Sequence, residues 1–194
     1  MKKLTLTMTL AVATVATAII SCNSGSSAVT GEIQISHDSL VKRGSYLVNA
    51  IGCDDCHSPK KFGPHGPEII KELRFSGFQA NGILPKIDTN VSKKGWIMFA
   101  PDLTATVGPW GISYAANISS DGTGIGNWTE EQFMRAIREG KSKGLVESRP
   151  LMPPMPWEQY RNLDDTDLKA IFAFLKTTKP VENRVPGWKK WSEL

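Results

Sequence analysis

The sequence predicts a mainly helical domain that is interrupted by a long, loop-rich insertion. Apolar residues recur at helical spacing in three short segments, near positions 40–51, 133–137 and 168–175. Between the first two, residues 58–127 hold six prolines and ten glycines, so long helices are not expected there. A chain of 194 residues needs no more than one such domain.

The first helical segment carries Leu40, Leu47 and Ile51 on one face. We expect Asp38 or Ser39 to cap its N-terminus, and Gly52 to end it. Gly44 lies on the apolar face and has no side chain, so a second helix can cross closely at this position.

The insertion is not low-complexity sequence, because it contains short aromatic runs at 96–99 and 112–114. These runs favour a structured insertion that contains a small β-hairpin. The glycine-rich stretch 122–126 lacks the lysine and the preceding strand of a phosphate-binding loop. It predicts a turn.

Two helices are expected after the insertion. Thr129 and Gln132 have the spacing of a capping box, and Gly140 is placed to close that helix. Asp164 is expected to cap the last helix, which Pro180 ends.

The N-terminus has the pattern of a bacterial lipoprotein signal peptide over residues 1–21. Lys2 and Lys3 precede an apolar, Thr-rich run that leads to Cys22. We expect a lipid on Cys22 and export to the periplasmic or outer face of a membrane. A membrane-spanning helix is the alternative, but the run is short for one.

The predicted mature chain has three parts. Residues 22–37 are rich in Ser and Gly and predict a flexible tether. Residues 38–183 form the domain, and 184–194 are a C-terminal tail whose Trp188 and Trp191 can fold back on it.

Residues Cys53 to His57 have the C-x-x-C-H spacing of a c-type haem attachment site. Cys53 and Cys56 can each bond one vinyl group of a haem, and the His57 imidazole then coordinates the iron. A redox pair or half of a zinc site is the alternative, but no second Cys pair completes a zinc shell. With Cys22 assigned to lipid, no cysteine remains for a disulfide.

A second axial ligand is expected from residues 149–157, which hold four prolines in nine positions. A methionine sulfur raises the reduction potential relative to bis-His ligation. Met155, with proline on both sides, is the first candidate and Met152 the second. His37 and His65 are bis-His alternatives that are better explained as exposed loop residues.

Three further side chains near this segment can contact haem propionates. Trp157 offers one N–H donor, and Arg149 or Arg161 offers a charged one. A lid over the haem edge is an equally good role for Trp157.

These motifs resemble a class I c-type cytochrome, of the monohaem exported bacterial kind with a long insertion after the haem motif. The resemblance covers roughly residues 39–183 and implies a cytochrome c-like helical domain around one covalent haem c. It implies Cys53 and Cys56 as thioether positions and His57 and Met155 as axial ligands. The 98-residue separation of His57 and Met155 is longer than in the smallest members.

Three functions are compatible with this chemistry. The first is a membrane-tethered one-electron carrier that works with redox partner proteins. The second is the cytochrome subunit of a membrane dehydrogenase or oxidase complex, and the third is a peroxidase-type haem enzyme with an open distal site. Neither a nucleophilic catalytic set nor a phosphate-binding loop is present. With both axial positions of the iron filled, no substrate needs to reach it, so we expect no small-molecule substrate. A net charge of +4, half of it from the predicted signal, does not indicate a nucleic-acid partner.

Overall fold

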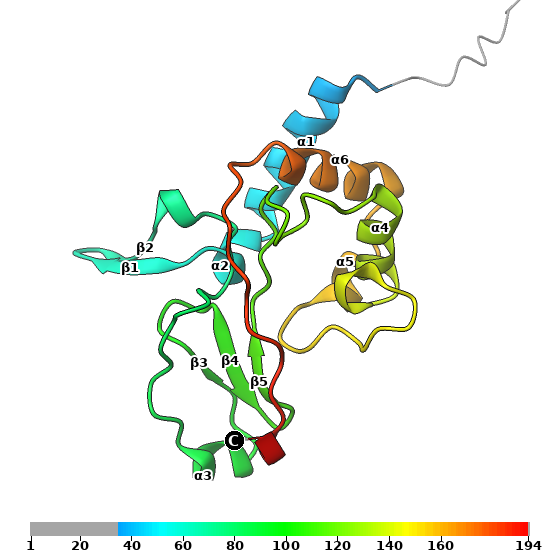
Figure 1. Cartoon of the computed structure of the whole chain (residues 1–194). Coiled ribbons are helices and arrows are strands. Elements are labelled where there is room, and N and C mark those ends of the chain that lie inside the picture. The colour runs from blue at the N-terminus through cyan, green and yellow to red at the C-terminus, as the bar shows by residue number, and fades with distance from the viewer. Residues whose placement is uncertain (1–34, 194) are drawn as a thin grey trace, which may run out of the picture. The chain divides into compact units, whose positions relative to one another are not determined.

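A computed structural model describes residues 35–193 (Figure 1). The predicted signal peptide, the lipid at Cys22 and most of the predicted tether lie outside the described residues. Within them, the expected mainly helical fold with a loop-rich insertion that contains β-structure is confirmed. None of the helices in residues 35–193 combines the length and the apolar character needed to cross a membrane.

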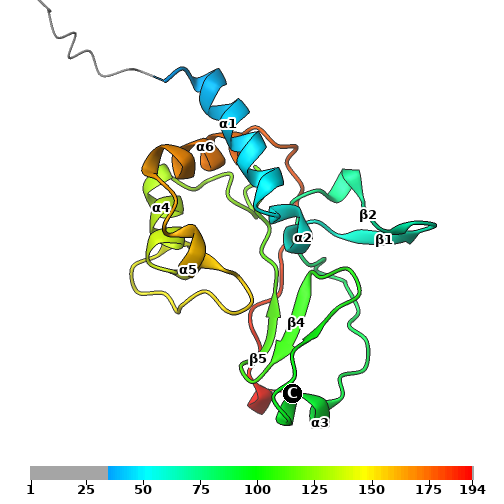
Figure 2. The ribbon, with the colours of Figure 1, turned by 180° about the vertical axis from the view of Figure 1, so that it is seen from behind.

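The first and last long helices of the described chain pack against each other. These are α1 (His37–Ala50) and α6 (Asp165–Lys176), which cross in Figures 1 and 2. Gly44 of α1 is buried at the crossing, where a Cβ would overlap the carbonyl oxygen of Ala170 in α6. The predicted close approach at Gly44 is therefore confirmed. The core around this crossing contains Leu47, Val48, Phe75, Ile125, Phe133, Ile137, Leu168, Ile171, Phe172 and Leu175.

The start of α1 differs from the expectation by two to three residues. Ser36, rather than Asp38 or Ser39, is the N-cap, and its Oγ accepts a hydrogen bond from the backbone N–H of Ser39 at 3.2 Å. Asp38 falls in the first turn instead, where a carboxylate interacts favourably with the helix dipole. Gly52 follows the helix with φ of 75°, as expected of a helix-ending glycine.

The predicted capping box of α4 (Glu130–Arg138) is complete. Thr129 Oγ1 accepts from the Gln132 backbone N–H at 3.1 Å, and Gln132 Oε1 accepts from the Thr129 N–H at 3.0 Å. Asp164 is the N-cap residue of α6, but its side chain accepts no hydrogen bond there. Gly140 follows α4 with φ of 65°. The segments η2 (Ser142–Gly144) and α5 (Trp157–Tyr160) lie between α4 and α6.

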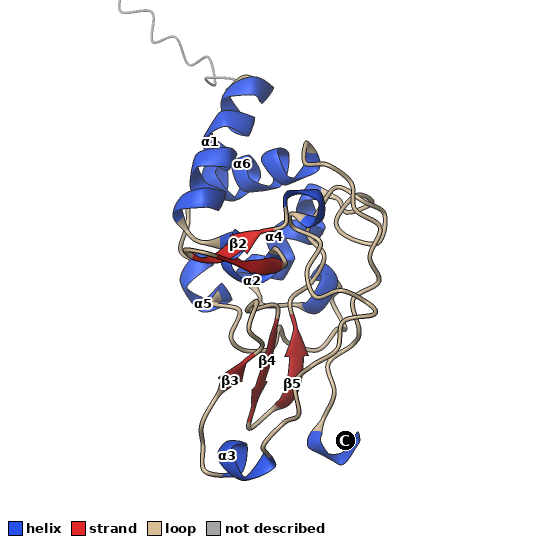
Figure 3. Ribbon diagram, turned by 90° about the vertical axis from the view of Figure 1, so that its left-hand side faces the viewer, coloured by secondary structure: helices blue, strands red, loops and turns tan. Residues whose placement is uncertain are grey.

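The insertion contains more strand than the one small hairpin that was expected. β1 (Lys60–Gly63) and β2 (Gly66–Ile69) form one antiparallel hairpin. β3 (Met98–Phe99), β4 (Ala105–Gly108) and β5 (Gly111–Tyr114) form an antiparallel sheet in that order (Figure 3). β4 lacks an alternating pattern because it is the central strand and all four of its residues are buried. Short helical segments, η1 (Lys71–Leu73) and α3 (Thr89–Lys93), lie between the two sheets in the chain.

Two other features of the insertion agree with the sequence. The runs at 96–99 and 112–114 contribute β3 and β5. The glycine-rich stretch 122–126 forms a turn, in which the Gly124 N–H donates to the Asp121 carbonyl at 2.9 Å. Ile125 in this turn is buried in the core.

The C-terminal tail folds back along the sheet, beside β5 (Figure 1). Trp188 Nε1 donates to the Trp110 carbonyl at 2.7 Å, and Trp191 Nε1 donates to the Gly108 carbonyl at 3.0 Å. Both acceptors lie at the β4–β5 turn, so the tail covers this end of the sheet. The last described segment is η3 (Trp191–Glu193).

Candidate haem-binding site

The C-x-x-C-H motif forms a short helix of its own, α2 (Cys53–His57). The left-handed conformation of Gly52 separates it from α1 and redirects the chain. Because residues three apart share a helix face, Cys53 and Cys56 project to the same side of α2. Both are partly buried, and neither forms a disulfide within the described residues. This spacing allows both sulfurs to bond one planar group.

The surroundings of the two thiols do not resemble those of a redox-active pair. Burial, reinforced by the charge of Asp54, raises the pKa of Cys53 to about 12. Burial likewise raises the pKa of Cys56. Redox-active C-x-x-C pairs instead have lowered thiol pKa values. The environment therefore favours uncharged sulfur, which suits a thioether at an apolar group.

His57 is held by a hydrogen bond from its ring to the insertion. Its Nδ1 lies 2.7 Å from the carbonyl oxygen of Ala116, which only accepts, so Nδ1 carries the proton. Burial lowers the pKa of His57, which keeps the ring neutral. The remaining ring nitrogen, Nε2, then has a free lone pair, as metal-binding histidines require. The partner lies 59 positions away in the chain, so sequence spacing did not reveal it.

Asp54, one of the two residues between the cysteines, fixes α2 to the insertion. Arg74 donates to both carboxylate oxygens, from Nε to Oδ1 at 3.0 Å and from Nη2 to Oδ2 at 2.6 Å. Ser58 Oγ donates to Asp54 Oδ1 at 2.6 Å and accepts from the Phe75 backbone N–H at 2.9 Å. The motif is thus tied to residues 74–75 by paired charges and hydrogen bonds. Nothing in the sequence pattern singled out Arg74.

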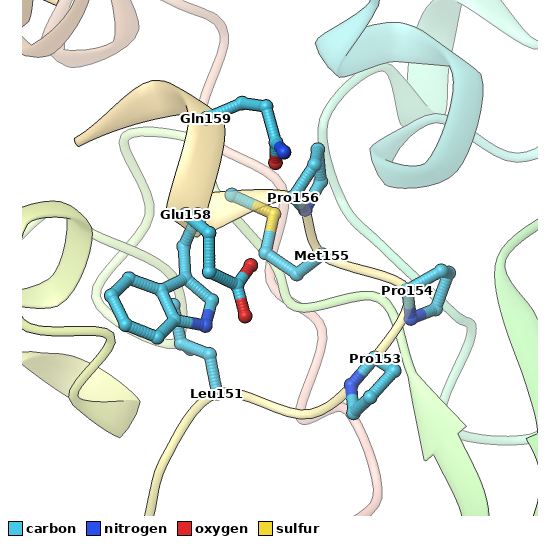
Figure 4. A pocket seen from close by; sticks show the side chains of 8 residues that line it. Leu151, Pro153, Pro154, Met155, Pro156, Glu158 and Gln159 are labelled. Carbon is cyan, nitrogen blue, oxygen red and sulfur yellow. The ribbon is translucent and has the colours of Figure 1, made fainter. Parts of the chain in front are cut away.

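Met155 lines a small cavity of about 270 Å³ in the proline-rich segment. Its side chain lies among the lining residues, beside Pro156 and Gln159 (Figure 4). Met155 also packs against the same core cluster that Cys53 contacts. Met152 does not line the cavity. Met155 and Met152 thus differ in their surroundings, while His37 and His65 are both exposed.

Tyr160 connects the methionine segment to the haem motif. Its hydroxyl donates to the Ile51 carbonyl at 2.8 Å, at the junction of α1 and α2. Burial raises the pKa of Tyr160 to about 12, and the neighbouring Cys53 and Cys56 contribute to that rise. Tyr160 is thus hydrogen-bonded at the residue that precedes Gly52 and α2, a placement that no sequence pattern indicated.

The three candidate propionate contacts are placed differently. Trp157 packs under Gly140, where a Cβ would overlap its ring, and the Arg161 guanidinium lies 5.6 Å from the ring centroid. Arg149 is directed elsewhere, with its guanidinium 5.9 Å from the Trp188 ring. Trp157 and Arg161 adjoin the methionine segment, whereas Arg149 contacts the tail.

The fold and this site define a cytochrome c-like domain, mainly α with a β-containing insertion. The chain matches no protein-family model. It is similar to the fructose dehydrogenase cytochrome subunit of Gluconobacter japonicus, with 30% identity over 152 residues, which are 77% of this chain and 24% of the relative. It is similar also to the gluconate 2-dehydrogenase cytochrome c subunit of Pantoea cypripedii, with 31% identity over 139 residues, 71% of this chain and 23% of the relative.

A shorter match is to a subunit of nicotinate dehydrogenase from Pseudomonas putida. It has 40% identity over 80 residues, which are 41% of this chain and 6% of that protein. The chain spans about a quarter or less of the length of these relatives. It is thus related to cytochrome c subunits of dehydrogenases over one part of their length.

Proposed function

We propose that this chain binds one haem c and transfers single electrons. In this proposal Cys53 and Cys56 form the thioether bonds, and His57 and Met155 are the axial ligands. The observation that carries it is the His57 ring, whose Nδ1 is held by the Ala116 carbonyl while Nε2 keeps its lone pair. Two thiols on the same helix and a methionine in an apolar segment complete a donor set that fits haem.

The chain's own residues hold the group and exclude water rather than act on a substrate. The bound haem would supply a reversible one-electron change at iron. With Met155 as the second axial ligand the iron would have no open position for a substrate, so in this proposal the chain is an electron-transfer component and not a catalytic subunit. The partly buried cysteines and the neighbouring core limit access of water to the group.

Two settings for this electron transfer follow from the sequence and its relatives. In the first, a lipid at Cys22 tethers the domain to the periplasmic or outer face of a membrane, and separate redox proteins exchange electrons with it. In the second, the domain is the cytochrome subunit of a membrane dehydrogenase or oxidase complex. The names of the relatives, which are cytochrome subunits of dehydrogenases, favour the second.

Spectroscopy of the exported full-length protein tests the haem site. We expect a six-coordinate ferric spectrum with the weak near-infrared band of a methionine–iron bond. Met155→Ala should abolish that band, whereas the matched variant Met152→Ala should retain it. Cys53→Ala combined with Cys56→Ala should make the haem extractable with acidified acetone. A five-coordinate ferric spectrum in the wild type, with rapid peroxide turnover that Met155→Ala leaves intact, would favour the peroxidase alternative.

Purification in mild detergent tests the setting. A stable complex with a dehydrogenase subunit would support the subunit role, whereas recovery of the chain alone would support the carrier. Labelling of Cys22 with a radioactive fatty acid, lost in Cys22→Ala, tests the lipid.

A further inference from the structure

The side chain of Lys60, the first residue of β1, returns to the end of α2. Its ammonium group donates to four backbone carbonyl oxygens: Asp55 at 2.7 Å, Ser58 at 2.9 Å, Asp54 at 3.1 Å and Asp102 at 3.2 Å. Two of these acceptors belong to the C-x-x-C-H helix itself. The charge is therefore held at one place beside the motif.

This cation has no anionic partner within the described residues. No carboxylate oxygen there lies within 4.0 Å of its Nζ, and the side chains of the nearby aspartates are directed elsewhere. Asp54 pairs with Arg74, Asp102 accepts from Thr104, and the Asp55 carboxylate lies beside Gly52. The hydrogen-bond partners of the Lys60 ammonium are carbonyl oxygens, so within residues 35–193 its charge is not neutralised by a direct ion pair with a carboxylate.

The charge of Lys60 is held against the helix that would carry the haem. Lys60 follows His57 by three positions, and two of the carbonyl groups that accept from its ammonium belong to α2, which contains Cys53, Cys56 and His57. The positive charge therefore lies within hydrogen-bonding distance of the backbone of the motif.

We propose that Lys60 is a fixed cation that raises the reduction potential of the haem held at Cys53, Cys56 and His57. A positive charge beside the iron disfavours the ferric state, which carries one more positive charge than the ferrous state. This inference rests on the proposed function. The proposed effect of Lys60 is electrostatic, so Lys60 does not need to contact the iron or its ligands.

A redox titration of the haem-loaded full-length protein tests the inference. Lys60→Met keeps an unbranched apolar stem and removes the charge. We expect the ratio of ferric to ferrous haem, at the wild-type midpoint, to rise by about threefold to tenfold; tenfold corresponds to about 59 mV for one electron.

Lys61→Met is the matched control. Lys61 is the next residue of β1, is exposed, and points to the opposite face of the strand. Removal of the Lys61 charge should shift the midpoint potential of the haem little, and 1 M salt should abolish that small shift. The shift caused by Lys60→Met should persist in 1 M salt, because the Lys60 charge is partly buried. Equal shifts in the two variants would overturn the proposal.

Further variants separate the field of Lys60 from its role as a hydrogen-bond donor. Lys60→Gln keeps hydrogen-bond donors but removes the charge, so it should lower the reduction potential of the haem as Lys60→Met does. It replaces Lys60→Met as the test variant if Lys60→Met folds poorly. Lys60→Arg keeps the charge and should stay near the wild type, with the methionine–iron band unchanged. A purely structural role predicts that Lys60→Gln resembles the wild type, which would overturn the proposal. A wild-type chain that takes up no haem would instead overturn the proposed function, and this inference with it.

Discussion

Gly44 in α1 lies directly on the backbone of Ala170 in α6, with no space for a side chain between them. The contact brings together two helices that are separated by most of the described chain. The haem motif follows α1 after two residues, and α6 follows the methionine segment and α5. The crossing at Gly44 therefore sets the positions from which both predicted iron ligands are presented.

Gly44→Ala should destabilise the domain, although alanine is the better helix former by about 1 kcal/mol. The added methyl group would overlap the Ala170 carbonyl, and overpacking of this kind costs roughly 1–3 kcal/mol. The free energy of unfolding, from denaturant titration, measures the effect. Gly187→Ala adds the same methyl where no heavy atom lies within 4 Å, so it should change little. Wild-type stability in Gly44→Ala would contradict this account of the crossing.

The pair of Asp54 and Arg74 should contribute more than an ordinary surface ion pair. Asp54 has only 13% of its side chain exposed, and Arg74 has 36%. Arg74→Met leaves a poorly hydrated carboxylate beside the thiols, and after allowance for screening we expect a loss of roughly 1–3 kcal/mol. The exposed pair Lys169–Glu130, at 3.6 Å, is the control, and its disruption should cost less than about 0.5 kcal/mol. Double-mutant cycles for both pairs give the comparison.

Tyr160 should make the domain sensitive to alkali. Its folded-state pKa, raised by burial to about 12, lies above that of tyrosine in an unfolded chain, about 10. The contribution of the neutral Tyr160 hydroxyl to the free energy of unfolding is therefore complete below pH of about 10. It is lost as the pH rises to about 12. Tyr160→Phe should flatten the decline in the free energy of unfolding over this pH window, because phenylalanine has no hydroxyl group to ionise. At neutral pH the same variant should lose about 0.5–1.5 kcal/mol with the hydrogen bond to Ile51. An unchanged alkaline decline would show that Tyr160 is hydrated.

Asn183 should be the most sensitive position of the C-terminal region. Its buried side chain donates to the carbonyls of Ser76 and Phe78, at 2.7 and 2.9 Å, and accepts from the Ala80 N–H at 2.9 Å. Asn183→Ala would leave these backbone groups without partners, at a cost of roughly 1–3 kcal/mol. The neighbouring Glu182 is exposed, so Glu182→Ala should be nearly neutral. Protection of the Ala80 amide from hydrogen exchange should fall in Asn183→Ala alone.

Local chemistry in the sequence was enough to predict much of the helical framework. The capping box at Thr129 and Gln132, the glycine after α4 and the proximity of Cys53, Cys56 and His57 all depend on residues a few positions apart. Such features are encoded by short-range sterics and hydrogen bonding. The N-cap of α1 was misplaced because Ser36, Asp38 and Ser39 are all good caps, and only the position of the helix on α6 selects among them.

Contacts between distant residues were decided by the tertiary structure. The Ala116 carbonyl that orients His57, the Arg74 guanidinium on Asp54 and the Asp102 carbonyl that accepts from Lys60 come from segments with no shared sequence pattern. The central strand β4 was missed because burial on both faces removes the alternation that marks a strand. The sequence by itself thus determined which residues we propose as haem-binding residues. The path of the chain through the insertion determined how the His57 ring is oriented and which cation pairs with Asp54. Backbone carbonyls and long-range ion pairs of this kind leave no local pattern in the sequence.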